Sequence, residues 1–110
     1  GYGYWVLEEL ATGDFVGSCG FANYKRQLQT ELKHLPEMGW IVAPQKQGLG
    51  FAREAGQRAL SWLETQNKEH QTYCIISPDN TRSIKLAESL GFKFVVSESY
   101  GTSVVRVYCR

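Results

Sequence analysis

The stretch APQKQGLGFAREA, residues 43–55, places two glycines at the start of a helical pattern. A run of three apolar residues, 40–42, precedes it, and after Phe51 alanines recur at the spacing of a helix. Glycine loses more backbone freedom on folding than other residues, so Gly48 and Gly50 require an explanation here. One explanation is a turn that needs positive φ angles. The other is a backbone left open to an anion at the first helical turn.

Outward from this turn, the pattern predicts eight elements in the order β β β α β α β β. Strands are expected at residues 2–10, 15–24, 35–44, 72–77, 93–100 and 103–109, and helices at 51–67 and 78–92. Asp79 or Asn80 is expected to cap the second helix, and Gly91 to end it. The predicted fold is a single α/β domain (α+β in some schemes) over residues 1–110. Its mixed, largely antiparallel sheet is flanked by two helices.

Composition and charge exclude several classes of protein. The 110 residues carry a formal net charge of +1, which gives no general electrostatic case for binding nucleic acid or a membrane surface. No apolar run approaches the roughly 20 residues that span a bilayer, and we expect no secretory leader. Cys19, Cys74 and Cys109 lack CxxC spacing, so we expect small buried hydrophobes, no metal site and a reducing, cytoplasmic location. His34 and His70 are expected at the surface.

Considered alone, the residues of the glycine turn leave two interpretations open after two others are set aside. A dinucleotide site is disfavoured because Arg53 stands where G-x-G-x-x-G has its third glycine. A P-loop is excluded because no Gly-Lys-Ser/Thr follows the glycines. A purely structural turn and a site for anion capture remain. The free N–H groups and the positive dipole end of a helix hold phosphates, and Lys46 adds positive charge beside the turn.

The residues around the turn resemble a known signature. Gln45, Gly48 and Gly50 match the Q/R-x-x-G-x-G/A pattern of the GNAT superfamily of acyl-CoA N-acyltransferases. Asn80, Ser83, Gly91 and Phe92 are similar to the N-x-x-S…G-F segment of the same superfamily. The wider pattern of its RimJ/RimL-type branch is matched by Glu37, Gly39, Trp40, Gly48, Gly50, Phe51, Ala52, Glu54 and Ala55. The resemblance implies the acyl-CoA N-acyltransferase fold, lacking the family's N-terminal strand and helices.

The resemblance also implies an activity. Such a protein transfers an acetyl group from acetyl-CoA to a primary amine, either a protein N-terminus or a small molecule, by direct attack without a metal. Many family members use a tyrosine as general acid, and Ala87 stands in its place here. This departure leaves a non-catalytic acyl-CoA-binding or interaction module as the alternative. The acceptor amine is not identified, and a homodimer is one assembly that the sequence allows.

The same resemblance assigns roles to individual residues. Glu37 is the candidate base, with His34 a weaker one, and Ser83 is the candidate proton donor to the leaving thiolate. The alternatives are a solvated strand-edge charge for Glu37 and a solvated helix hydroxyl for Ser83. Asn80 is expected either to contact the cofactor or to cap its helix. The remaining cofactor-binding residues are expected to be Trp40, Ile41, Val42, Gln45, Lys46, Gln47, Gly48, Leu49, Gly50, Phe51 and Ala52.

The resemblance further implies a gap in the sheet. The coenzyme diphosphate is expected on the glycine turn, and the pantetheine arm beside the strand that holds residues 40–42. The arm requires this strand and the strand at 72–77 to separate into a V, which a bulge near Gly39 would produce. A strand N–H near Ile41 or Val42 is then placed to polarise the thioester carbonyl.

Overall fold

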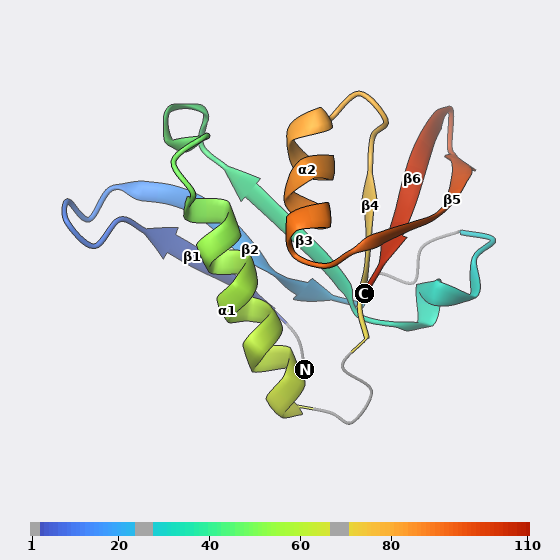
Figure 1. The fold of residues 1–110 in the computed structure, drawn as a ribbon, viewed down its shortest axis with the longest axis horizontal. Helices are drawn as coiled ribbons and strands as arrows, with labels where there is room; N and C mark the ends of the chain where they lie inside the picture. The colour runs from blue at the N-terminus through green and yellow to red at the C-terminus, as the bar shows by residue number, and fades with distance from the viewer. Residues whose placement is uncertain (1–2, 24–27, 67–70) are drawn as a thin grey trace.

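The computed structural model describes residues 3–23, 28–66 and 71–110, and it confirms the predicted order of strands and helices (Figure 1). The strands are β1 Tyr4–Glu8, β2 Phe15–Ala22, β3 Glu37–Val42, β4 Tyr73–Ile76, β5 Lys93–Tyr100 and β6 Ser103–Cys109. The helices are α1 Phe51–Gln66 and α2 Thr81–Ser89, with short 3₁₀ turns η1 Glu31–His34 and η2 Pro44–Lys46. The predicted end of α1 at residue 67 and the predicted surface position of His70 lie outside the described residues.

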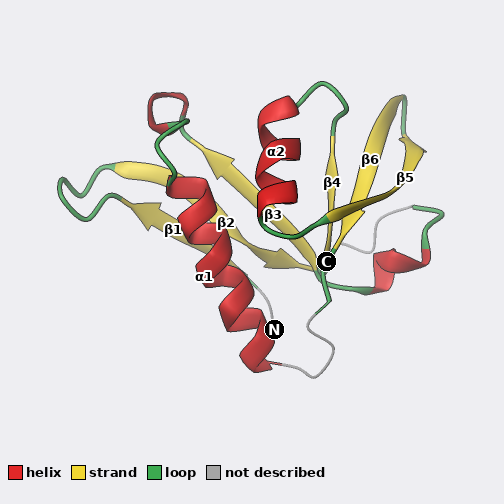
Figure 2. Ribbon diagram, viewed as in Figure 1, coloured by secondary structure: helices red, strands yellow, loops and turns green. Residues whose placement is uncertain are grey.

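The six strands form one mixed sheet in the order β1-β2-β3-β4-β6-β5 (Figure 2). Neighbouring strands are antiparallel except β3 and β4, which are parallel because α1 connects them as a crossover. Both helices lie on one face of the sheet, in front of it in the view of Figure 1. The predicted architecture, a largely antiparallel sheet with two helices, is therefore confirmed.

Strands β3 and β4 pair at one end and separate from there. In the described residues, Glu37 and Tyr73 are the only partners that the two strands share, and Figure 1 shows the strands diverging toward the starts of α1 and α2. The predicted V-shaped gap is confirmed. The bulge predicted near Gly39 is wrong, because β2 and β3 keep one register across that residue. The gap arises because β4 pairs along its whole length with β6 and leaves β3 after one residue.

Two hydrophobic clusters cover the two faces of the sheet, because side chains alternate along a strand. The larger cluster packs both helices on the sheet and includes Leu63 and Cys74, which are 0% and 2% exposed. The smaller cluster lies on the other face and includes Tyr73 and Val107. Consecutive residues of β4 therefore point to opposite faces. Truncation of a fully buried leucine such as Leu63 to alanine costs about 2–5 kcal/mol of the free energy of unfolding. Packing in the larger cluster therefore contributes strongly to holding the helices on the sheet.

The expectations for the cysteines and for His34 can be compared with the structure. Cys19 and Cys74 are buried and Cys109 is half-buried, and all three thiols are free. Burial raises the pKa of the Cys19 thiol to about 11, which keeps it protonated and inert near neutral pH. His34 is exposed in η1, as expected. No helix in the described part of the chain is long and apolar enough to cross a membrane.

Candidate active site

The glycine turn begins where β3 ends. Pro44 opens η2 and stops the strand, since proline has no N–H to donate to a ladder. Gly48 and Gly50 have φ angles of 77° and 86°, in the left-handed region that favours glycine. A Cβ on Gly50 would meet nothing within 4 Å, so the space beside it is open. The turn therefore needs glycine for its conformation, and it is also accessible to a ligand.

A cavity of about 440 Å³ lies against this turn, between the start of α1 and the start of α2. The Glu54 N–H donates to the Gly50 carbonyl at 3.1 Å, so the N–H groups of residues 51–53 precede the helical ladder and suit an anion. The predicted cofactor residues that line this cavity are Trp40, Ile41, Val42, Lys46, Gln47, Gly48, Gly50, Phe51, Ala52 and Asn80. Gln45 and Leu49 are exposed on the same turn but do not line it.

The Lys46 ammonium forms ion pairs with two carboxylates of the protein. Its ammonium donates to Glu9 Oε2 at 2.8 Å and to Asp14 Oδ2 at 3.3 Å, which ties the η2 turn to the turn between β1 and β2. The hydrogen bond with Glu9 is the largest of the effects that raise the pKa of Lys46. The positive charge that Lys46 was expected to offer a diphosphate is therefore balanced within the protein.

Arg53 and Arg82 add further cations to the lining of the same cavity. They come from the first turns of α1 and α2. A Cβ on Gly48 would lie 3.9 Å from Nη1 of Arg82, so this guanidinium reaches the glycine turn. The sequence-based prediction missed Arg82. The signal that could have revealed it is a cation in the first turn of a helix, where the dipole disfavours positive charge.

A second cavity of about 320 Å³ continues from the first into the gap between β3 and β4. The residues that line both cavities are Trp40, Ile41, Asn80 and Ser83. Glu37 lies in the wall of the second cavity, is 4% exposed, and accepts a hydrogen bond from the Tyr73 hydroxyl. The interpretation of Glu37 as a solvated edge charge is therefore wrong, while its role as a base stays a prediction. His34, the weaker candidate, lines neither cavity.

The cap of α2 positions the next two site residues. Asn80 Oδ1 accepts a hydrogen bond from the Ser83 N–H at 3.2 Å, so Asn80, and not Asp79, is the N-cap. The cap uses only the amide oxygen, and the cofactor contact predicted for Asn80 stays a prediction. Trp40 Nε1 donates to Ser83 Oγ at 3.2 Å, so the Ser83 hydroxyl is half-buried and hydrogen-bonded, not a solvated helix hydroxyl. The hydroxyl accepts in this bond, which leaves its own proton to donate.

Ala87, at the place of the family tyrosine, is fully buried in the larger core cluster. Tyr108 is buried in the same cluster and lines neither cavity. The tyrosine that lines the second cavity is Tyr4 of β1, whose ring and hydroxyl lie against Gly39, where a Cβ would clash with them. The sequence-based prediction missed Tyr4, because it is brought to β3 by the order of the strands and not by a motif.

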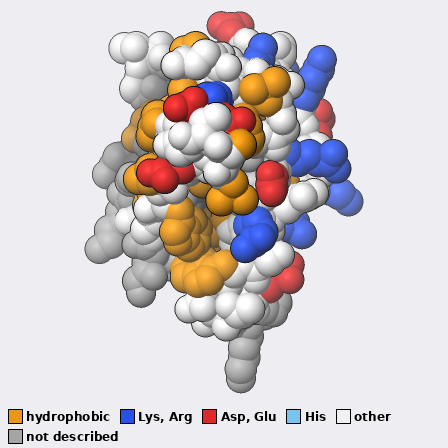
Figure 3. Space-filling model, turned by 90° about the vertical axis from the view of Figure 1, so that its left-hand side faces the viewer, with side chains coloured by type: hydrophobic (Ala, Val, Ile, Leu, Met, Phe, Trp, Pro, Cys, Tyr) orange, Lys and Arg blue, Asp and Glu red, His pale blue; other side chains and the backbone are white. Residues whose placement is uncertain are grey.

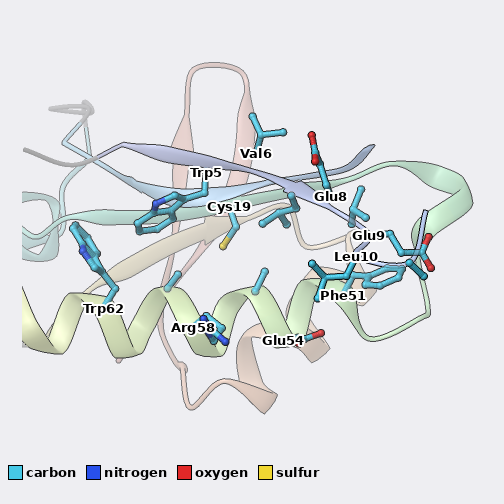
Figure 4. Close-up of a pocket in the computed structure, with 15 residues that line it drawn as sticks. Trp5, Val6, Glu8, Glu9, Leu10, Cys19, Phe51, Glu54, Arg58 and Trp62 are labelled. Carbon is cyan, nitrogen blue, oxygen red and sulfur yellow. The ribbon is translucent and has the colours of Figure 1, made fainter. Parts of the chain in front are cut away.

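A larger cavity, of about 770 Å³, lies between β1 and α1 (Figure 4). Trp5 and Trp62 meet edge-to-face in it with ring centroids 5.0 Å apart, and Figure 3 shows hydrophobic side chains exposed among charged ones on that side of the molecule. Of the predicted site residues it includes only Phe51. The predicted catalytic residues, Glu37 and Ser83, therefore lie in the two smaller cavities and not in this one.

Comparisons with known proteins agree with this geometry. A family model of the acetyltransferase (GNAT) domain matches residues 1–93. The chain is 30% identical to the uncharacterized protein YkkB of Bacillus subtilis, over 100% of this chain and 63% of YkkB. It is 30% identical to the uncharacterized N-acetyltransferase p20 of Bacillus licheniformis, over 74% of this chain and 43% of p20. A solved structure of a putative GnaT-family acetyltransferase from Bordetella pertussis superposes with a TM-score of 0.88 and 28% identity, over 99% of this chain and 65% of that chain.

This chain therefore belongs to the GNAT acetyltransferase family. Its fold, its glycine turn and its divided sheet are those that the sequence resemblance led us to expect. The chain spans less than two thirds of the length of the two relatives, 63% of YkkB and 43% of p20.

Proposed function

We propose that the protein is an acetyl-CoA-dependent N-acetyltransferase that transfers the acetyl group directly to a primary amine. The observation that carries this proposal is one cleft that joins the glycine turn to Glu37, because the two cavities share four lining residues. One end of the cleft presents helix N–H groups that suit a diphosphate, and the other end holds a buried carboxylate that suits proton transfer. Membership of the GNAT family supports the same chemistry.

The first half of the cleft would bind the cofactor. N–H groups of the glycine turn and of residues 51–53 would hold the diphosphate, with Arg53 and Arg82 beside it. The helix dipole supplies about 0.3–1 kcal/mol and each charge-assisted hydrogen bond roughly 1.5–3 kcal/mol. Beyond Glu37, the β3 edge faces the gap instead of β4, so its backbone is placed to pair with the pantetheine arm.

The second half of the cleft would carry the reaction. Glu37, directly or through a water, takes a proton from the ammonium form of the amine. The neutral nitrogen then attacks the thioester carbonyl carbon to form the new C–N bond, and a β3 N–H near Ile41 or Val42 stabilises the oxyanion. As the C–S bond breaks, the nitrogen loses its second proton to solvent, and the Ser83 hydroxyl donates a proton to the thiolate and regains one from solvent. Glu37 then releases its own proton to solvent. The products are an amide and CoA, and no covalent enzyme intermediate is needed.

A non-catalytic acyl-CoA-binding or interaction module is the second candidate. It is favoured by Ala87, which leaves α2 without the tyrosine that many family members use as general acid. In this case the cleft binds the cofactor, and no amine is acetylated.

Four finer assignments complete the proposal. The RimJ/RimL-type branch rests on the sequence pattern that includes Glu37, Gly39 and Trp40. A cytoplasmic location is supported by three free thiols. The proposed acceptor is a primary amine, either a protein N-terminus or a small molecule. The proposed assembly is a homodimer, which sedimentation would test.

Calorimetric titration of the protein in its full natural length with acetyl-CoA tests the cofactor. We expect one site with a micromolar Kd, where 1 μM corresponds to about −8.2 kcal/mol. The absence of binding in this range would refute the proposal. Release of the CoA thiol is then followed with a tripeptide that has a free N-terminus, with spermidine and with 2-phenylethylamine. The N-acetylated tripeptide is the blocked control, and tight binding without acetylation of any amine favours the module.

A further inference from the structure

A hydrogen bond inside the protein joins the Glu37 carboxylate to a tyrosine hydroxyl. Tyr73 donates from its hydroxyl to Glu37 Oε1 at 3.1 Å, and the two side chains are 1% and 4% exposed. The same two residues are the only β3–β4 partners in the described part of the chain. The bond therefore lies at the apex of the V, where the two strands begin to separate.

The backbone on both sides of this apex is held by further hydrogen bonds. The Pro36 carbonyl accepts from the Thr72 hydroxyl at 2.7 Å and from the Tyr73 N–H at 3.2 Å. Thr72 and Arg110 exchange backbone hydrogen bonds of 2.9 and 3.0 Å, which join the start of β4 to the end of β6. Thr72 is 0% exposed. Neither Glu37 nor Tyr73 can shift along its strand without breaking this set of bonds.

We propose that Tyr73 is a positioning residue, which holds the Glu37 carboxylate in one orientation at the inner end of the cleft. This inference rests on the proposed function. A buried carboxylate is costly unless it is hydrogen-bonded, and a hydroxyl that donates to it favours the charged form. A carboxylate has about four lone-pair sites, and the hydrogen bond with Tyr73 occupies one of them.

The other titratable side chains around Glu37 fit this role. Tyr4 from β1 and Cys74 from β4 line the same cavity. Burial, followed by the charge of Glu37 and by Cys109 of β6, raises the pKa of the Cys74 thiol. Cys74 therefore stays neutral near pH 7. The thiol adds no second negative charge that would compete with Glu37 for the proton of the amine.

The test replaces Tyr73 by phenylalanine, which removes one hydroxyl and keeps the ring. Tyr108→Phe is the matched control, because Tyr108 is 2% exposed and lines neither cavity. With the amine probe that the wild type acetylates, we expect Tyr73→Phe to lower kcat roughly ten- to a hundred-fold, with an unchanged KM for acetyl-CoA. Tyr108→Phe should leave both unchanged.

A double-mutant cycle separates this role from a structural one. If Tyr73 acts through Glu37, Tyr73→Phe lowers kcat in the wild type but not in a Glu37→Gln background. Equal losses in both backgrounds, or a Tyr73→Phe variant that matches Tyr108→Phe, would overturn the inference while the proposed function stands. Failure of the wild type to bind acetyl-CoA in the calorimeter, or to acetylate any probe, overturns the function first and this inference with it.

A second variant covers the case in which Tyr73→Phe does not fold, as judged by circular dichroism. Glu37→Asp keeps the charge and draws the carboxylate away from the Tyr73 hydroxyl by one methylene. We expect the same fall in kcat, again with an unchanged KM for acetyl-CoA. A Glu37→Asp protein with the rate of the wild type contradicts the proposal.

Discussion

Trp40 Nε1 lies 3.2 Å from Ser83 Oγ and donates a hydrogen bond that ties β3 to α2 across the cleft. Both residues line both cavities, so the bond lies between the glycine-turn end and the Glu37 end of the cleft. The indole also packs edge-to-face on Phe92, with ring centroids 6.4 Å apart. The position of the Ser83 hydroxyl is therefore fixed by a rigid neighbour from another element.

Removal of this hydroxyl tests its role in proton donation. We expect Ser83→Ala to lower kcat by about a hundred-fold or more, the usual range for a general acid, while the Kd for acetyl-CoA changes little. Ser89→Ala, an exposed serine at the other end of α2, is the matched control and should retain the wild-type rate. Steady-state kinetics with calorimetry measure both quantities. An unchanged kcat in Ser83→Ala would assign the hydroxyl to the Trp40 hydrogen bond and not to proton donation.

The glycine turn can be tested with two glycines that share a backbone conformation. Gly50 and Gly101 have φ angles of 86° and 62°, and a Cβ on either would meet nothing within 4 Å. Alanine in the left-handed region costs about 1–2 kcal/mol at each position, so the two variants should lose similar stability in chemical unfolding. Only Gly50→Ala is expected to weaken acetyl-CoA binding, because its Cβ occupies the approach to the helix N–H groups. Equal affinities for the two variants would make the turn purely structural.

Arg82 gives a test of the charge beside the turn. We expect Arg82→Ala to raise the Kd for acetyl-CoA several-fold and to flatten its dependence on salt, since a phosphate loses a cation. Lys85→Ala, an exposed cation one turn along α2 and outside the cavity lining, controls for net charge. Titrations at low and high salt make the comparison. If both variants respond alike, Arg82 contributes only general attraction.

The Lys46 bridge predicts a pH dependence of stability. Hydrogen bonds with Glu9 and Asp14 raise the pKa of Lys46 above its ordinary value of 10.5. Folding therefore favours the charged lysine, so the contribution is complete below pH 10.5 and is lost as pH rises through the raised pKa. We expect Lys46→Met to melt below the wild type at pH 7, with a difference that shrinks in strong alkali. Lys93→Met is the control for an exposed lysine, and a difference independent of pH would contradict the bridge.

The local features of this protein were readable from its sequence. The strand–turn–helix boundary at Pro44, Gly48 and Gly50 follows from what proline and glycine allow a backbone to do. The cap at Asn80 and the left-handed stop at Gly91, with φ 95°, are decided within one helix by neighbouring groups. Such preferences act over a few residues, so the order of elements and the two motifs could be predicted together.

The partners of the site residues were decided only by the tertiary structure. Glu37 and Tyr73 are 36 positions apart, and Lys46 and Glu9 are 37 apart. These pairs meet because the sheet places β4 beside β3, and the β1–β2 turn beside η2. The predicted gap opened without the predicted bulge, since β4 leaves β3 to pair with β6. The sequence by itself determined where the glycine turn stands and which residues form it. Only the fold decided which charges are balanced within the protein and which face the cleft, because hydrogen bonds and ion pairs form between groups that the strand order brings together.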